Sequence, residues 1–304
     1  MAEGDSPTVA RRRVRLAIRE AREAHNLTQQ QVADEMEWSL SKVIRIESGE
    51  VSISVNDLRQ LLQFVGIKGK AEINSLLADA RIARTRQRQA WYERPKYREH
   101  LSDSLRKHIQ YEAEAYAIRY YSIYFIPGPL QIPEYAEGLL KLFVDEIPQE
   151  RRDTLLEARQ LRHEALLARV NDVRLLVLLD ESVLHRQLGG PEVFAAQLRE
   201  LVRLAGEELA TIRMVPFTLE APLTNNASFD LVSLGPADSD GMVLYYENGM
   251  TDELDEDAVT TSRHRTRFEK VWHEAADEMD TINFIRSRIK DLEVTISQRR
   301  GNSK

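Results

Sequence analysis

The sequence predicts two domains: an all-α domain of five short helices, followed by a larger α+β domain that ends in a long helix. Three features support this prediction. Apolar residues recur at three- and four-residue intervals in five short segments between residues 9 and 79. After residue 101, apolar runs of strand length alternate with helical segments. No proline follows residue 236, and no glycine lies between residues 249 and 301, which favours helix in the C-terminal part.

Short polar residues mark where the helices of the first domain begin. The predicted helices cover residues about 9–25, 28–36, 39–48, 55–65 and 69–79. Thr28 and Gln31 have the spacing of a capping box at the start of the second helix. Ser39 is placed to cap the third helix and Ser54 the fourth, because their hydroxyl oxygens can accept from backbone N–H groups of the first turn.

The third helix is predicted to have an apolar inner side and a polar, basic outer side. Val43 and Ile46 are expected to point into the domain. The residues that remain on the outer side are Leu40, Ser41, Lys42, Ile44 and Arg45. A short helix of this kind fits the major groove of double-stranded DNA, where side chains reach the edges of the bases.

The segment from residue 27 to residue 49 carries a family pattern. Its residues are Leu27-Thr28-Gln29, Val32-Ala33, Ser39, Val43, Arg45-Ile46-Glu47 and Gly49. In this order they resemble the helix-turn-helix of the xenobiotic-response-element type (Cro/C1-like, the XRE family), which lambdoid phage repressors share. The resemblance implies a lambda-repressor-like DNA-binding domain over residues 9–79. A helix-turn-helix module that binds only other proteins is the alternative.

The resemblance also implies which residues touch DNA. Gln29, at the start of the second helix, would bind a phosphate. The residues that would face base edges are Ser41, Lys42 and Arg45, together with Leu40 and Ile44. Arg45 suits a paired contact with guanine O6 and N7, whereas the two apolar side chains suit a thymine methyl group.

Three further positions concern the fold of this motif. Arg22 and Glu47 occupy positions that form an internal ion pair in several such repressors, so both are expected to be structural. Position 37 is usually glycine, because the turn favours a positive φ there, and here it is Glu37. A side chain in that conformation costs roughly 1 kcal/mol. We therefore expect the turn to be slightly remodelled.

Charge is distributed unevenly along the chain. The net charge is −7, but residues 1–110 contain 20 Lys and Arg against 15 Asp and Glu, whereas residues 111–304 contain 22 against 34. A basic N-terminal third suits contact with phosphates. The predicted connector, residues 80–100, is its most basic part, and the candidate phosphate contacts there are Arg84, Arg86 and Arg88. A solvated, charged linker helix is the alternative.

The second domain, residues 101–297, is predicted to contain helices and strands. Apolar residues recur at helical spacing through residues 101–122, which predicts one helix there. A proline-rich turn leads into a helix from about residue 133, and further helices are expected near 148–170 and 191–207. Strands are expected at 173–180, 211–216, 228–234 and 242–247. Residues 255–297 would form one long helix or two nearly collinear helices.

Two apolar patterns in the second domain have a structural and a functional interpretation. The aromatic residues between Tyr111 and Phe125 are either core or the lining of a pocket for a flat or apolar effector. In the last helical segment, an apolar stripe runs from Phe268 through Met279 to Ile296. This stripe either packs against the sheet of its own domain or forms part of a dimer interface.

The strongest sign of chemistry is Asp180-Glu181, at the end of a predicted buried strand, with His185 four residues later. An enzyme would place catalytic or metal-binding groups here. The same residues suit an ordinary strand-to-helix transition, with Asp180 or Ser182 as a cap. The other histidines lack metal-ligand spacing, and the sequence has no phosphate-binding or nucleophile motif. We therefore expect no catalytic site, no metal and no cofactor.

A second resemblance extends over roughly residues 10–290. The matching residues in the second domain are Glu112-Ala113-Glu114-Ala115, Pro127-Gly128, Leu130-Gln131, Tyr135-Ala136, Arg159 to Leu167, Leu179-Asp180-Glu181, Gly189-Gly190-Pro191, Gln197-Leu198, Val215-Pro216-Phe217 and Phe229. The order is similar to a large actinobacterial group of regulators whose C-terminal domain is uncharacterised. The resemblance implies a transcriptional regulator, sometimes with a small companion protein. The chain departs from this pattern at 247–255, where the group more often has a shorter Gly-containing turn and a strand.

Together these features predict a cytoplasmic, sequence-specific, DNA-binding transcriptional regulator. The chain has no cysteine, no secretory signal and no apolar run long enough for a membrane span. One recognition helix reads only a few base pairs, so a homodimer on a palindromic operator is expected. The second domain would receive a small-molecule effector or a partner protein. The main alternative is an antitoxin-like protein that controls a small companion protein, with DNA binding as autoregulation.

Overall fold

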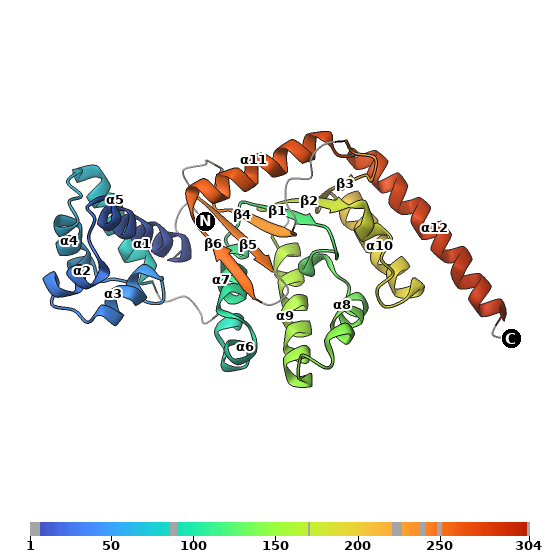
Figure 1. The fold of residues 1–304 in the computed structure, drawn as a ribbon, viewed down its shortest axis with the longest axis horizontal. Coiled ribbons are helices and arrows are strands. Elements are labelled where there is room, and N and C mark those ends of the chain that lie inside the picture. Colours follow the sequence, from blue (N-terminus) through green and yellow to red (C-terminus); the bar gives the residue numbers. More distant parts are fainter. Residues whose placement is uncertain are drawn as a thin grey trace. The chain divides into compact units, whose positions relative to one another are not determined.

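The computed structural model describes residues 7–85, 90–169, 171–220, 227–236, 241–247 and 251–302. The chain divides between Ala90 and Trp91 into two compact units (Figure 1). This division lies inside the predicted connector. Each unit has its own core.

The first unit consists, in its described part, of the five predicted helices. They are α1 (Pro7–Ala24), α2 (Gln29–Glu35), α3 (Leu40–Glu47), α4 (Val55–Phe64) and α5 (Lys70–Ala83). Ser54 Oγ accepts from Asp57 N at 3.0 Å and caps α4, as the sequence predicts. Gly49 follows α3 with a φ of 80°, a conformation that a residue without a Cβ adopts readily.

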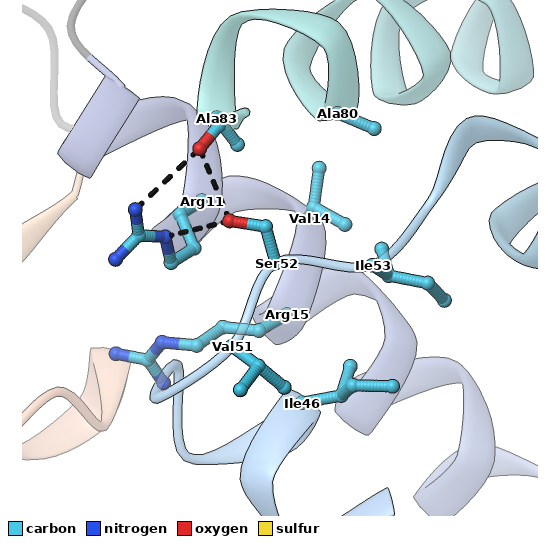
Figure 2. Close-up of a pocket in the computed structure, with 9 residues that line it drawn as sticks. All are labelled: Arg11, Val14, Arg15, Ile46, Val51, Ser52, Ile53, Ala80 and Ala83. Carbon is cyan, nitrogen blue, oxygen red and sulfur yellow. Dashed lines mark hydrogen bonds between the residues drawn. The ribbon is translucent and has the colours of Figure 1, made fainter. Parts of the chain in front are cut away.

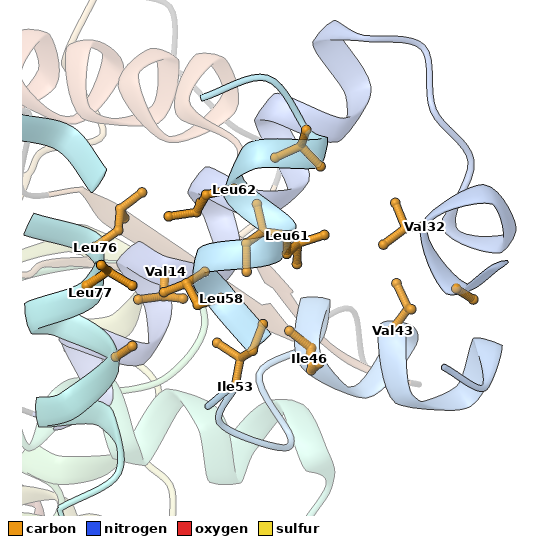
Figure 3. Packing of buried hydrophobic residues seen from close by; sticks show 14 residues of the cluster. Val14, Val32, Val43, Ile46, Ile53, Leu58, Leu61, Leu62, Leu76 and Leu77 are labelled. Carbon is orange, nitrogen blue, oxygen red and sulfur yellow. The ribbon is translucent and has the colours of Figure 1, made fainter. Parts of the chain in front are cut away.

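One apolar core joins these helices (Figure 3). Each helix contributes fully buried aliphatic side chains, such as Ile18 from α1, Val32 from α2 and Leu58 from α4. Val43 and Ile46 of α3 are 2% and 3% exposed, so the predicted inner side of this helix is confirmed. Burying one such side chain contributes about 1.5–3 kcal/mol. This packing fixes which side of α3 remains outside.

Figure 2 shows the residues that line a small cavity between α1, the end of α3, the segment after it and α5. Arg11 Nε donates to Ser52 Oγ at 3.1 Å, and both side chains donate to Ala83 O, at 3.4 and 3.0 Å. The carbonyl of Ala83 in the last turn of α5 is thereby satisfied. The cavity measures about 10 Å³, which is room for no more than a water molecule. The hydrogen bonds of Arg11 and Ser52 join α1, α5 and the segment after α3.

In its described part, the second unit contains helices and one six-stranded sheet with the order β3-β2-β1-β4-β5-β6. Its strands are β1 (Ala117–Ser122), β2 (Arg174–Asp180), β3 (Thr211–Val215), β4 (Phe229–Ser233), β5 (Met242–Glu247) and β6 (Asp252–Asp255). Its α-helices are α6 (Pro95–His100), α7 (Asp103–Glu112), α8 (Pro133–Leu140), α9 (Gln149–Leu167), α10 (Pro191–Gly206), α11 (Ala258–Glu274) and α12 (Glu278–Asn302). Its 3-10 helices are η1 (Trp91–Glu93), η2 (Gly128–Leu130), η3 (Lys141–Phe143) and η4 (Glu181–Leu184). The first three strands pair in parallel and the remaining pairs are antiparallel.

The prediction of one helix over residues 101–122 is wrong. Helix α7 ends at Glu112, and Ala117–Ser122 form β1, which lies between β2 and β4. All six residues of β1 are buried. A strand that is buried on both faces shows no alternation of apolar and polar residues, so its pattern can be mistaken for a helical one.

Helices cover both faces of the sheet (Figure 1). Helix α11 covers the face that carries Tyr121, Leu178 and Leu231, and it adds Phe268 and Val271 to their cluster. Helix α7 contacts β5 and β6 on the opposite face. Half of the aromatic stretch is core, since Tyr111, Tyr120 and Tyr121 are at most 5% exposed, whereas Tyr124 is 52% exposed. None of the described helices is long and apolar enough to cross a membrane.

The C-terminal segment forms two helices that run in clearly different directions in Figure 1, rather than a nearly collinear pair. Helix α11 stops at Ala275, whose ψ of 160° is extended. Ala276 N then donates to Met214 O at 2.9 Å, and Met214 N donates to Thr281 Oγ1 at 3.0 Å. The chain between the helices is thus bound to strand β3 at the edge of the sheet.

Helix α12 packs along α10 and β3. Its fully buried side chains are Thr281, Ile285 and Leu292. The predicted apolar stripe is correct for Phe268 and wrong for Met279, which is 69% exposed. Because the chain changes direction at Ala275, the face of α12 that packs against the unit does not continue the buried face of α11. A stripe drawn at helical spacing through both helices therefore wrongly assigns Met279 of α12 to the interior.

Candidate nucleic-acid interface

Hydrogen bonds at their first turns fix the two helices of the motif. Thr28 Oγ1 accepts from Gln31 N at 3.2 Å, and Gln31 Oε1 accepts from Thr28 N at 2.8 Å, which confirms the capping box. Ser39 Oγ accepts from Lys42 N at 3.2 Å at the start of α3. These caps satisfy N–H groups that have no partner within the helix.

The turn between α2 and α3 keeps the geometry that usually requires glycine. Glu37 has a φ of 56°, and Trp38 N donates to Ala33 O at 2.8 Å. The expected remodelling at Glu37 is therefore wrong. Met36 and Trp38, on either side, pack against the core of the unit. This packing outweighs the roughly 1–2 kcal/mol that a side chain costs in the left-handed region.

The outer side of α3 brings the predicted base-reading residues onto one surface. Leu40 and Ile44 are 38% and 43% exposed, which is unusual for side chains of this size in the unit. Ser41 and Arg45 are exposed, and Lys42 is half-buried. A row of apolar and basic side chains on a capped, well-packed helix is able to contact both thymine methyl groups and guanine edges.

Lys42 and Arg45 have partners within the unit. Lys42 Nζ lies 3.2 Å from Asp57 Oδ2 and 3.7 Å from the centre of the Trp38 ring. Arg45 Nε lies 3.4 Å from Glu50 Oε2, and both of these side chains are more than half exposed. Exposed pairs of this kind contribute at most about 1 kcal/mol. A nucleic-acid phosphate or base can therefore replace the carboxylates at little cost.

A buried ion pair positions Gln29. Arg22 Nε and Nη2 donate to the two carboxylate oxygens of Glu47 at 2.7 and 3.0 Å, so the predicted internal pair is present. The hydrogen bond with Glu47 raises the pKa of Arg22. Gln29 Nε2 also donates to Glu47, at 2.8 Å. An amide nitrogen carries two hydrogens, so one N–H of Gln29 remains to meet a phosphate.

The basic connector is only partly described. Arg84 is exposed and directly follows α5, whose last residue is Ala83. Arg86 and Arg88 lie outside the described residues. The structure thus leaves Arg84 accessible to a phosphate.

Asp180, Glu181 and His185 form a strand-to-helix transition. Asp180 Oδ1 accepts from Ser182 N at 2.9 Å and caps η4, as the structural interpretation predicts. Glu181 Oε2 accepts from Phe217 N at 2.8 Å, and its other oxygen lies 3.2 Å from His185 Nε2. Both carboxylates thus bind backbone N–H groups of the second unit.

Sequence reasoning missed a buried charged cluster on the face of the sheet opposite α11. Arg162 donates to both oxygens of Glu112 at 2.7 Å. His108 Nε2 lies 3.1 Å from Asp230 Oδ2 and 3.4 Å from Glu112 Oε1. Within the described residues, His108, Glu112 and Asp230 are the one such group close enough to share a cation. The guanidinium of Arg162 already occupies both oxygens of Glu112.

The charges of this cluster balance when His108 is protonated. Burial alone would lower the pKa of His108, but Glu112 and Asp230 raise it above its usual value. Burial alone would raise the pKa of Glu112, but Arg162 and His108 hold it far below its usual value. Two positive and two negative charges then offset one another beneath the sheet. The cluster has the character of a structural ion network.

Only weak signals for this cluster exist in the sequence. His108 and Glu112 are four residues apart on α7, which places them on one side of the helix. Asp230 is an acidic residue within an apolar strand, and Arg162 comes from α9. Nothing in their spacing indicates that these three elements meet.

Comparisons with known proteins agree with this division of the chain. A family model described as a helix-turn-helix domain matches residues 14–76. A family model described as a domain of unknown function, DUF5753, matches residues 105–287. No curated protein and no solved structure matches the chain. The first match coincides with the unit that carries α3 and the second with the sheet-containing unit.

Proposed function

The chain belongs to the family of the domain of unknown function DUF5753, here preceded by a helix-turn-helix domain, and we propose that it is a sequence-specific transcriptional regulator. The helix-turn-helix domain supports DNA binding. The finer proposal concerns which residues choose the sequence. Ser41, Lys42 and Arg45 would read base edges, Leu40 and Ile44 would contact thymine methyl groups, and Gln29 and Arg84 would bind phosphates.

The outer side of α3 is the single observation that carries this proposal. Leu40, Ile44 and Arg45 are exposed and Lys42 is half-buried, whereas the inner side of the helix is fixed by packing and its first turn by a cap. A protein surface that orders such side chains before binding loses less conformational entropy when it binds. Lys42 and Arg45 already pair with the carboxylates of Asp57 and Glu50, which DNA groups would replace.

A homodimer on a palindromic operator is part of the proposal. One recognition helix reaches only a few base pairs, and a second copy would double the contacts. Half-sites would then lie one helical turn apart, about 34–36 Å, or a multiple of that distance. Analytical ultracentrifugation of the protein with and without operator DNA measures how many copies of the chain associate.

The second unit would receive a small effector or a partner protein rather than carry out catalysis. Asp180 and Glu181, the residues most suggestive of an active site, use carboxylate oxygens to hold backbone N–H groups. Control of a small companion protein remains the alternative role. Co-purification of such a protein in a fixed ratio would favour that role, and a homodimer without a companion would oppose it.

The deciding experiment is selection of bound genomic fragments by wild-type protein and Arg45→Ala at physiological salt. Loss of a paired guanine contact costs about 1–3 kcal/mol and relaxes one operator position. Arg199→Ala is the matched control, because it removes an equally exposed arginine from the second unit. Wild type and control should enrich one short palindrome that Arg45→Ala loses. Equal weakening of Arg45→Ala on operator and random DNA would contradict base reading by Arg45.

A further inference from the structure

A polar pocket of about 270 Å³ lies in the second unit, on the sheet face that α11 covers. Arg119 of β1 and Arg174, the first residue of β2, line it from the sheet. Arg265 and Glu269 line it from α11. The volume is close to the lower end of the range for small-molecule sites. It is far larger than the cavity of about 10 Å³ in the first unit.

The charge of the pocket is opposite to that of the domain around it. Among the residues that the structure describes, its charged lining consists of three arginines and one glutamate, a net charge of +2. Residues 111–304 as a whole contain 22 Lys and Arg against 34 Asp and Glu. A pocket lined by positive charges and enclosed by low-dielectric protein strengthens the local positive potential and attracts anions. Because the domain as a whole is acidic, its overall charge does not explain why three arginines gather in this pocket.

Arg119 has more hydrogen-bond donors than the described residues satisfy. It lies on a central strand and is 9% exposed. Nη1 donates to Ser233 Oγ at 3.0 Å, and Nη2 donates to Glu269 Oε1 at 3.3 Å. Its Nε is buried without a hydrogen-bond partner in the described part of the chain. A guanidinium offers five N–H donors, so a buried arginine with two bonds remains under-satisfied.

Burial and neighbouring positive charges also disfavour the charged form of Arg119. Burial lowers the pKa of Arg119, Glu269 offsets part of that effect, and the positive charges of Arg265 and Arg174 lower the pKa further. Glu269 Oε1 is shared, because it also accepts from Arg265 Nε at 3.0 Å. One carboxylate oxygen thus serves two guanidinium groups. Its position also shows that an anion fits between them.

Arg174 lines the pocket with an exposed side chain, which is accessible to a bound anion. Its side chain is exposed, and it has no ion-pair partner among the residues that the structure describes. Its guanidinium carbon lies 6.0 Å from the centre of the Tyr116 ring, which also lines the pocket. Tyr116 would offer an aromatic wall to the organic part of a ligand.

We propose that this pocket binds a small organic dianion, such as a dicarboxylate or a phosphate monoester. Two negative charges would neutralise the net charge of the lining, and guanidinium groups match the oxygens of either group in paired hydrogen bonds. This goes beyond DNA recognition, and it would give the second unit an effector whose chemical class is defined. Occupation of the pocket does not depend on the first unit.

Isothermal titration of the full chain without DNA tests the proposal. The probes are succinate, glycerol 3-phosphate and inorganic phosphate, with uncharged succinamide as the ligand control. Arg174→Gln should weaken dianion binding about tenfold or more, since it removes a charge-assisted hydrogen bond. Arg263→Gln is the matched protein control, because Arg263 is exposed on the same helix α11 and does not line the pocket. It should bind as wild type does.

Glu269→Gln provides a change of opposite sign. It removes the negative charge that competes for Arg119 and Arg265, so dianions should bind several-fold more tightly. No measurable binding by wild type at millimolar probe would overturn the proposal. So would equal binding by Arg174→Gln and Arg263→Gln, or binding of succinamide as strong as that of succinate. Arg45→Ala should bind the probes unchanged, so a failure of the proposed operator reading leaves this test intact.

Discussion

Among single residues, Glu47 connects the interior of the first unit to its proposed DNA surface. Its two carboxylate oxygens accept from Arg22 and from Gln29, and the residue is 5% exposed. The pair is structural, as the family resemblance implies, but its effect reaches the surface through the amide of Gln29. Changes at Glu47 should therefore alter both stability and phosphate contact.

Glu47→Ala is expected to lower the free energy of unfolding of the first unit by about 3 kcal/mol, because it leaves Arg22 buried with the exposed carboxylate of Glu23 as its remaining charged partner. Hydrogen exchange of the α3 amides measures this change locally. Arg19→Ala is the control, since it breaks an exposed pair with Glu23 in the same unit and should cost at most about 1 kcal/mol. Equal effects of the two substitutions would show that the Arg22–Glu47 pair contributes no more than a surface pair.

His108 is the residue whose protonation should govern the pH dependence of the second unit. Its folded pKa is raised by Glu112 and Asp230 above the usual value near 6.5. The stabilisation is therefore complete below the unfolded pKa and is lost as the pH rises through the folded pKa. Protection of the β1 amides from hydrogen exchange, corrected for intrinsic rates, should fall over that interval.

His108→Gln should remove this pH dependence, whereas His185→Gln should keep it, because His185 is exposed. The charged groups around His108 are Glu112 on its own helix, Asp230 on β4 and Arg162 on α9. The ring of Tyr245 stacks on the imidazole, with 4.2 Å between the ring centres. An unchanged fall in protection in His108→Gln would assign the pH dependence to another group.

Among the elements, the junction between α11 and α12 depends on one side chain. Thr281 is fully buried, and its Oγ1 accepts from Met214 N of strand β3. The junction turns α12 towards α10, so that the C-terminal helix packs against its own unit. This packing favours the structural interpretation of the C-terminal segment.

Thr281→Val keeps the shape of the side chain and removes the acceptor. The N–H of Met214 is then buried without a partner, which should cost about 1–3 kcal/mol of unfolding free energy. Thr281→Ser is the control, because it keeps the hydroxyl and removes only a methyl group. Denaturant unfolding followed by circular dichroism of the two variants should rank Ser above Val. The reverse order would mean that packing of the methyl group holds the junction.

For the whole molecule, the uneven charge distribution predicts how DNA binding responds to salt. Each Lys or Arg that neutralises a phosphate releases counterions, so binding weakens as salt rises. Replacing Arg84, Arg86 and Arg88 by Gln should weaken binding to all sequences alike. It should also reduce the slope of log K against log salt by up to about 2.7, or roughly 0.9 for each phosphate that is no longer neutralised. Fluorescence anisotropy over a salt series measures that slope.

An unchanged slope would leave the connector arginines as part of a solvated linker. Arg45→Ala is the useful comparison within the same series, since it should change the preference among sequences more than the slope. The two kinds of variant together separate residues that position the protein on DNA from residues that read the sequence.

The sequence alone determined the parts of this protein that depend on neighbours along the chain. Helices α1 to α5, the caps at Thr28, Ser39 and Ser54, and the outer side of α3 follow from spacings of three and four residues. Strand β2 and helix α10 also follow, because a strand of apolar residues and a helix after Gly190-Pro191 are local signals.

Tertiary structure decided what depends on residues far apart in the chain. Strand β1 is a strand because β2 and β4 pair with both of its edges, although its own pattern resembles a helix. The positive φ of Glu37 is retained because the core holds its neighbours. The His108 cluster and the arginine pocket join charged residues from separate elements, and no spacing in the sequence indicates which of these elements meet. Burial and pairing energies of the whole fold select those contacts, and local preferences do not.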